Sequence, residues 1–176
     1  MPESQYESLK DFVRDVPDFP KPGILYRDIT PLLNDPSALG TAVAGLAERY
    51  GDARIDVVAA AEARGVLFGL PLAMELGVGF VPIRKPGKLP YETRTVEYEL
   101  EYGTDALEIH VDAFTQGQRV LIVDDLLATG GTVAACCDLV EAAGAVVVAC
   151  AFLIDLTFLE GANRLAPREV FSLLQY

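Results

Sequence analysis

The chain has 176 residues, of which 51% are hydrophobic and 23% charged, enough to bury a complete core in one domain. Its 26 acidic and 14 basic residues give a formal net charge of -12. Binding to nucleic acid or to an anionic membrane requires basic surfaces, so this charge argues against both partners. No apolar run approaches the roughly 20 residues that span a bilayer, and the polar N-terminus has no signal core. We therefore expect a soluble, cytoplasmic protein.

Hydrophobic spacing and turn residues predict the elements at the start of the chain. Apolar residues between positions 6 and 13 recur at helical intervals, which predicts an amphipathic helix that ends before Pro17. Four prolines and a glycine in residues 17–31 predict an ordered, extended loop. Asp35 followed by Pro36 has the character of a helix start, so a second helix is expected up to Gly51.

Strands and helices then alternate. Short apolar runs predict buried strands, and longer apolar segments ending at glycine predict helices. The strands are expected at 55–61, 78–83, 119–124 and 145–154, and the helices at 65–76 and 133–144. This order is typical of a single α/β domain in which a parallel sheet is flanked by helices.

A polar insertion interrupts this alternation. Residues 84–102 contain Pro86, Gly87 and Pro90, and residues 95–102 alternate as in a hairpin. Loops of this length usually bind a ligand or cover a site, so we expect a flap here. Basic residues gather near it, namely Arg64, Arg84, Lys85, Lys88 and Arg94. They indicate either an anion site or a solvated surface, and charge alone does not separate the two.

The segment 120–132 carries the clearest chemical signal, because a strand runs through a loop into a helix. The loop offers unhindered N–H groups and two hydroxyls at a helix N-terminus, where a phosphate is favoured. The residues concerned are Ala128, Thr129, Gly130, Gly131 and Thr132. Asp124 and Asp125 are suited to accept hydrogen bonds from two neighbouring sugar hydroxyls near a magnesium ion. The alternative is that one aspartate caps a turn and the glycines only turn the chain.

Segment 120–132 resembles the phosphoribosyl pyrophosphate motif of the type I phosphoribosyltransferases, an acidic pair followed by Ala-Thr-Gly-Gly-Thr. The resemblance covers nearly the whole chain and is strongest to members that use adenine. It continues through residues 19–30 (Phe-Pro-Lys-Pro-Gly-Ile-Leu-Tyr-Arg-Asp-Ile-Thr), 62–65 (Glu-Ala-Arg-Gly), 84–90 (Arg-Lys-Pro-Gly-Lys-Leu-Pro) and 100–103 (Leu-Glu-Tyr-Gly). It implies one domain over 1–176, with an N-terminal purine-binding hood at 1–34 and a flexible flap at 84–104. It also implies a homodimer that uses Mg²⁺, held mainly through the substrate near Asp124 and Asp125.

The resemblance also implies residue roles. Pyrophosphate is expected to contact Ala63, Arg64, Arg84, Lys85 and Lys88, in part through a strained peptide in the loop 62–65. The catalytic residues would be Glu101, Arg64 and Lys85, with Glu101 assisting proton movement on the base. Adenine would bind Leu25, Tyr26, Arg27 and Leu156. Without the resemblance, Glu101 would be read as an exposed strand carboxylate, and Tyr26 and Leu156 as core residues.

Adenine is expected because its edge presents an amino donor at position 6 and an acceptor at N1. In the resembled enzymes the stretch 25–27 offers a backbone carbonyl and an N–H to that edge. The expected reaction yields AMP and pyrophosphate from adenine and phosphoribosyl pyrophosphate. The alternatives are a transferase for a 6-oxopurine and a non-catalytic regulator that senses phosphoribosyl pyrophosphate. A phosphoribosyl pyrophosphate synthase would need more chain than this.

Overall fold

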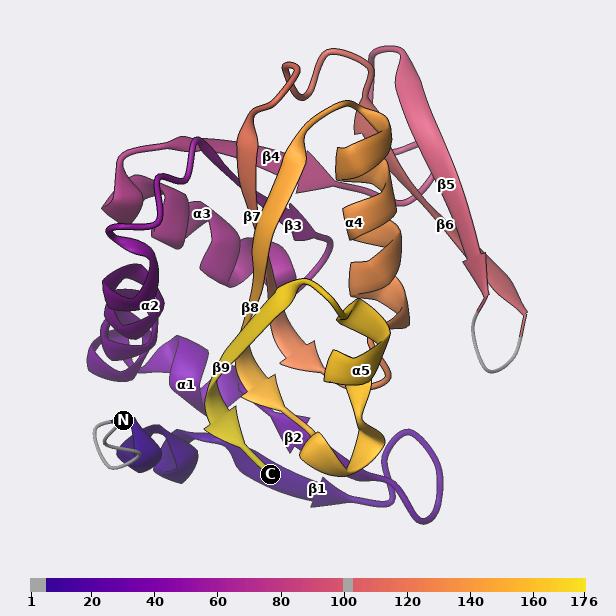
Figure 1. Cartoon of the computed structure of the whole chain (residues 1–176). Coiled ribbons are helices and arrows are strands. Elements are labelled where there is room, and N and C mark those ends of the chain that lie inside the picture. Colours follow the sequence, from indigo (N-terminus) through magenta and orange to yellow (C-terminus); the bar gives the residue numbers. More distant parts are fainter. Residues whose placement is uncertain (1–5, 100–102) are drawn as a thin grey trace.

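The computed structural model describes residues 6–99 and 103–176, and a five-stranded parallel sheet forms its centre (Figure 1). The strand order is β4-β3-β7-β8-β9. Their bounds are β3 Val57–Ala61, β4 Gly79–Ile83, β7 Arg119–Leu127, β8 Val146–Asp155 and β9 Glu169–Gln175. All four pairings are parallel. The carboxyl ends of all five strands therefore lie at one edge of the sheet, where ligands bind in folds of this class.

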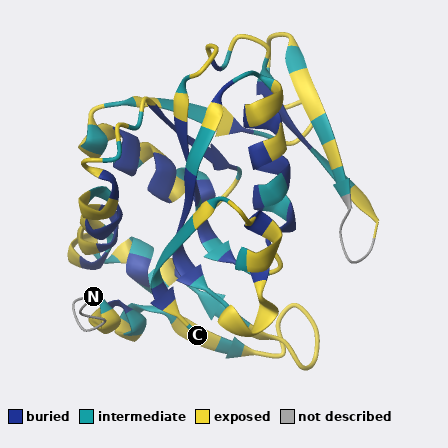
Figure 2. Cartoon of the chain, viewed as in Figure 1, coloured by how far each residue is buried: buried dark blue, intermediate teal, exposed yellow. Residues whose placement is uncertain are grey.

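Helices cover both faces of the sheet, as predicted for the α/β class. One face is covered by α1 (Thr30–Asn34), α2 (Pro36–Tyr50) and α3 (Gly65–Leu76), which bury Leu46, Phe68 and Leu72 against it. The other is covered by α4 (Gly131–Ala142) and α5 (Gly161–Leu165). Figure 2 shows the buried residues concentrated in the strands and on the inner helix faces. No helix in the described part of the chain is long and apolar enough to cross a membrane.

The second and third helices begin and end where their local signals indicate. The Asp35 carboxylate accepts hydrogen bonds from the N–H groups of Ser37 and Ala38, both at 2.9 Å, and α2 starts at Pro36. Helix α3 ends at Gly77, whose φ of +68° closes the last turn in the left-handed region. The predictions for these two helices are confirmed, as are the four strands predicted for the central sheet.

The N-terminal predictions were wrong in two respects. The expected amphipathic helix is a short 3-10 helix, η1 (Glu7–Phe12), followed by strand β1 (Arg14–Pro17). The segment 17–31, expected to be an ordered, extended loop without a regular element, contains strand β2 (Leu25–Asp28), which pairs antiparallel with β1. The reason is non-local: each four-residue strand is too short to show a period, and their mutual hydrogen bonds override local propensity.

The insertion forms a hairpin that stands beside α4 (Figure 1). Its strands are β5 (Thr93–Glu99) and β6 (Thr104–His110). The prediction placed the hairpin within 95–102, but its second strand lies further along the chain and is partly buried. Backbone hydrogen bonds between Arg84 and Glu108 join β6 to the end of β4. The predicted base-contacting residue Glu101 lies outside the described residues.

Candidate active site

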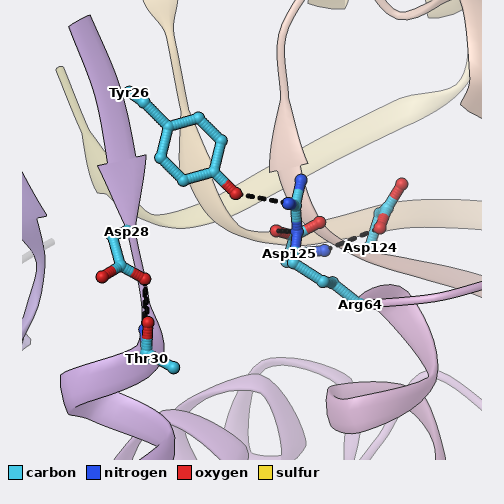
Figure 3. Close-up of polar contacts among 6 residues, drawn as sticks. All are labelled: Tyr26, Asp28, Thr30, Arg64, Asp124 and Asp125. Carbon is cyan, nitrogen blue, oxygen red and sulfur yellow. Dashed lines mark hydrogen bonds and ion pairs between the residues drawn. The ribbon is translucent and has the colours of Figure 1, made fainter. Parts of the chain in front are cut away.

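Arg64 links three segments at the carboxyl edge of the sheet (Figure 3). It follows β3 and stands at the N-terminus of α3, while Asp125 belongs to the neighbouring strand β7. Its Nε donates to Oδ2 of Asp125 at 2.5 Å, and its Nη1 donates to the hydroxyl of Tyr26 in β2. Residues expected to contact pyrophosphate, ribose and purine are therefore directly connected.

The two aspartates of β7 lie in different surroundings. Asp125 is 6% exposed and is paired with Arg64. Asp124 accepts the N–H of Asp125 at 2.9 Å and is not directly ion-paired in the described part of the chain. Burial, and then the neighbouring charge of Asp125, raise the pKa of Asp124 well above its usual range. A cation or hydroxyl donor arriving beside Asp124 would stabilise its charged form.

Gly65 allows α3 to begin against the end of β7. A Cβ at this position would lie 2.8 Å from Oδ1 of Asp124 and 3.0 Å from the carbonyl oxygen of Val123. Any side chain would displace either the carboxylate or the strand. The helix start that carries Arg64 thus depends on a glycine at the next position.

The loop between β7 and α4 is held tightly from behind. Gly130 caps α4 with a φ of +79° and provides no side-chain acceptor for the N–H groups of the first turn. A Cβ at Gly161 would lie 2.1 Å from the carbonyl oxygen of Ala128, and one at Gly130 would lie 2.7 Å from that of Gly161. Helix α5 therefore packs backbone to backbone on the loop. The N-terminus of α4, which has no side-chain cap, favours an anion there.

Glu62 connects the loop after β3 to the segment after β4. Its carboxylate accepts the N–H of Lys85 at 2.6 Å and the Nε of Arg84 at 3.0 Å. These two hydrogen bonds lower the pKa of Glu62, the one from Lys85 contributing most. The resemblance implied a strained peptide in this loop, and the Glu62–Ala63 peptide bond is cis. Lys88 follows at the next turn, where its N–H donates to the carbonyl of Lys85.

The ammonium group of Lys85 is held by the hairpin. It forms an ion pair with Asp105 of β6 at 3.0 Å, and this contact lowers the pKa of Asp105. The hydroxyl of Tyr98 in β5 donates a long hydrogen bond of 3.4 Å to the same carboxylate. Glu62, Tyr98 and Asp105 were not singled out from the sequence. Tyr98 and Asp105 are opposite each other in the β5–β6 hairpin, and the sequence did not predict that register.

The other residues expected to contact adenine lie on β2 or directly after β8. Leu25 is 47% exposed on β2, and the partly buried Leu156 directly follows β8. Arg27 has its side chain turned to Asp15 and to the ring of Tyr176. Glu101 is outside the described residues, so its position relative to the others stays a prediction. Within the described residues, no group of three or more acidic, histidine or cysteine side chains could hold a metal ion.

Comparison with known proteins identifies the class. A family model of the phosphoribosyl transferase domain matches residues 33–172. The adenine phosphoribosyltransferase of Rhodopirellula baltica is 61% identical over 172 residues, covering 98% of this chain and 84% of the relative. The chain therefore belongs to the phosphoribosyltransferase family, as the sequence motifs indicated.

Two solved structures define the likeness more narrowly. Adenine phosphoribosyltransferase from Thermoanaerobacter pseudethanolicus has a TM-score of 0.95 at 55% identity, covering 97% of this chain and 99% of that one. The enzyme of Saccharomyces cerevisiae, complexed with adenine and D-2,5-dideoxy-2,5-imino-altritol 1,6-bisphosphate, has a TM-score of 0.89 at 41% identity. That match covers 96% of this chain and 97% of the yeast chain. The fold is that of the adenine-using members.

Proposed function

We infer that this protein transfers the phosphoribosyl group of phosphoribosyl pyrophosphate to adenine, giving AMP and pyrophosphate in purine salvage. The Rhodopirellula relative carries the name of this activity, and the yeast relative was solved with adenine and a sugar-like bisphosphate. The observation that carries the inference is the arrangement around Arg64. Its guanidinium joins the β7 acidic pair to Tyr26, so donor and base would meet at one group.

The donor is proposed to bind along the β7–α4 loop. Its 5-phosphate would accept hydrogen bonds from the N–H groups and hydroxyls of residues 128–132, which have no side-chain cap of their own. Its ribose hydroxyls would donate to Asp124 and Asp125. The raised pKa of Asp124 supports this role, because hydroxyl donors would relieve the repulsion between two adjacent carboxylates.

The segments after β3 and β4 carry the cations that are proposed to bind the leaving pyrophosphate. We assign its binding to Ala63, Arg64, Arg84, Lys85 and Lys88, and their main effect would be to offset negative charge as the bond at C1 breaks. Glu62 holds Arg84 and the backbone of Lys85, while Asp105 holds the Lys85 ammonium. Groups fixed in this way need little reorganisation as charge develops.

Adenine is assigned to the space between β2 and Leu156. The backbone of Leu25 and Arg27 would read the amino group and N1, with Tyr26 and Leu156 packing against the ring. Glu101, which lies outside the described residues, is proposed to assist proton movement on the base. A 6-oxopurine would place an acceptor against a carbonyl and a donor against an N–H, which a buried site penalises strongly.

Magnesium is the cofactor that the donor set fits best. The carboxylate of Asp124 offers hard oxygen atoms, and its charged form is destabilised first by burial and then by the charge of Asp125, so a divalent cation beside it would stabilise that form. The cation would be held mainly by the oxygens of phosphoribosyl pyrophosphate, near Asp124 and Asp125. When bound, it would neutralise charge on the departing pyrophosphate.

We also propose that residues 1–176 act as one domain, with a purine-binding hood at 1–34 and a mobile flap at 84–104. A homodimer is favoured by an apolar stripe on the outer side of α3, where Leu67, Leu70 and Met74 are 44%, 46% and 75% exposed. Replacing Leu70 and Met74 by lysine should convert a dimer to a monomer in light scattering, and an unchanged mass would contradict this interface.

We propose a cytoplasmic location because the proposed substrate is a polyanion, which does not cross membranes.

The decisive assay measures AMP and pyrophosphate from adenine, phosphoribosyl pyrophosphate and magnesium, with hypoxanthine and guanine under identical conditions. Adenine should be the strongly preferred base. Product with hypoxanthine alone would reassign the protein to the 6-oxopurine transferases. Binding of the donor without product from any of the three bases would favour a sensor.

A further inference from the structure

Tyr176 touches both segments between which adenine is proposed to bind. Its ring lies against Arg27 of β2, with the guanidinium carbon 3.9 Å from the ring centre. Figure 1 shows this end of the chain beside β1 and β2. Lys10 of η1 approaches the same ring, with its ammonium 5.0 Å from the centre. A half-buried aromatic ring thus packs against cations from two N-terminal elements.

The backbone of Tyr176 forms hydrogen bonds with the residues on both sides of Leu156. Its N–H donates to the carbonyl of Asp155 at 3.0 Å, and its carbonyl accepts the N–H of Thr157 at 3.0 Å and the Thr157 hydroxyl at 2.8 Å. The residues on either side of Leu156 are therefore both tied to Tyr176. Leu156 itself donates its N–H to Leu127 of β7 at 2.9 Å. These four hydrogen bonds restrict the conformation of residues 155–157.

The side chain of Arg27 is engaged within the protein. It is 16% exposed, forms an ion pair with Asp15 of β1 and stacks on Tyr176. Its backbone is the part left to meet a ligand. Strand β2 and Leu156 are far apart in the sequence, so non-covalent contacts must set the distance between them. The stack of Arg27 on Tyr176 is one such contact.

We propose that Tyr176 is a positioning residue for adenine: its ring holds β2 and its backbone holds Leu156 at the separation that the base requires. The inference rests on the proposed placement of adenine between these segments. Among the described residues, none of the contacts of Tyr176 is with the donor loop 128–132, which begins after Leu127. Loss of the ring should accordingly weaken adenine binding and leave phosphoribosyl pyrophosphate binding unchanged.

The test is steady-state kinetics with each substrate varied in turn, on Tyr176→Leu and on two controls. Tyr176→Phe keeps the ring and removes a hydroxyl with no hydrogen bond among the described residues. Lys10→Ala removes the second cation together with its exposed ion pair to Glu7. Tyr176→Leu should raise KM for adenine about threefold to tenfold, with KM for phosphoribosyl pyrophosphate within twofold of wild type. Both controls should stay within about twofold of wild type for either substrate.

Two further variants keep the outcome interpretable. Arg27→Met removes the other half of the stack and also the ion pair with Asp15. Combined with Tyr176→Leu it should raise KM for adenine by less than the product of the two single effects, because the stack is lost only once. If Tyr176→Leu fails to fold, Arg27→Met alone must raise KM for adenine selectively. Leu156→Ala reports on the adenine placement itself. A raised KM for adenine in Leu156→Ala but not in the stack variants would overturn the role of Tyr176, whereas an unchanged Leu156→Ala would overturn the placement.

Discussion

The Nε of Arg64 donates to Oδ2 of Asp125 at 2.5 Å, so a cation assigned to the leaving group and a carboxylate assigned to ribose hold each other in place. The pair also links two adjacent strands, because Arg64 follows β3 and Asp125 lies within β7. Removing either partner affects both proposed functions at once.

Asp125→Asn is expected to lower kcat/KM roughly 10- to 100-fold, because a charge-assisted hydrogen bond is lost and Arg64 is left without its counter-charge. Asp138→Asn is the matched control, because Asp138 is exposed on α4 and its ion pair with Arg168 is long, at 4.0 Å. Kinetics of the two purified variants would check this. Full activity in Asp125→Asn would remove Asp125 from the ribose site.

Asp124→Asn is expected to stabilise the unliganded protein at neutral pH while lowering its activity. The folded-state pKa of Asp124 is raised, so its ionisation opposes folding above that pKa and is without effect below the unfolded value of about 3.9. The gain in Tm should therefore be largest at neutral pH and disappear as the pH falls toward 4. Thermal melts across this range, without substrate, measure it. A gain independent of pH would contradict the electrostatic cause.

Asp105→Asn is expected to raise KM for phosphoribosyl pyrophosphate about threefold to tenfold, because the ammonium of Lys85 loses the partner that orients it. Glu97→Gln, an exposed change in β5, is the control within the same hairpin. The folded-state pKa of Asp105 is lowered, so the ion pair is intact at neutral pH and is lost as the pH falls through that pKa. Wild type and Asp105→Asn should therefore converge in acid, and a difference that persists there would refute the ion-pair explanation.

Gly161→Ala is expected to destabilise the protein by about 1–3 kcal/mol and to weaken donor binding, because the added methyl group would overlap the carbonyl of Ala128. Gly40→Ala provides a contrast within α2, where a Cβ meets nothing within 4 Å. That change should stabilise the fold by roughly 0.5–1 kcal/mol. Urea unfolding of both variants gives the comparison. Equal effects of the two changes would mean that α5 does not press on the loop.

Local signals account for the elements that the sequence predicted well. Asp35 and Gly77 mark helix ends through hydrogen bonds and backbone angles within one turn, and the apolar runs of β3 and β7 are recognisable without a partner. The motif in 120–132 predicted a strand, a loop and a helix in that order because the three are contiguous there. The strand was expected to end at the acidic pair but continues to Leu127, because its last residues also pair with β8.

Contacts between distant segments account for what was missed. The strands β1 and β2 stabilise each other across a proline-rich turn, and β9 completes the sheet only through pairing with β8. The ion pair between Asp105 and Lys85 depends on the register of the β5–β6 hairpin. The contact between Tyr176 and Arg27 joins residues that are 149 positions apart in the sequence. No period or turn residue encodes such contacts.

The backbone contacts of Gly161 and Gly130 also bear on how a ligand would be received. Because α5 already presses the loop 128–132 into one shape, its N–H groups are oriented before any phosphate arrives. Little conformational entropy then remains to be lost on binding, so more of the interaction free energy is retained as affinity. Helix α5, which need not touch the substrate, would thus act as a template that keeps the loop in its receptive form.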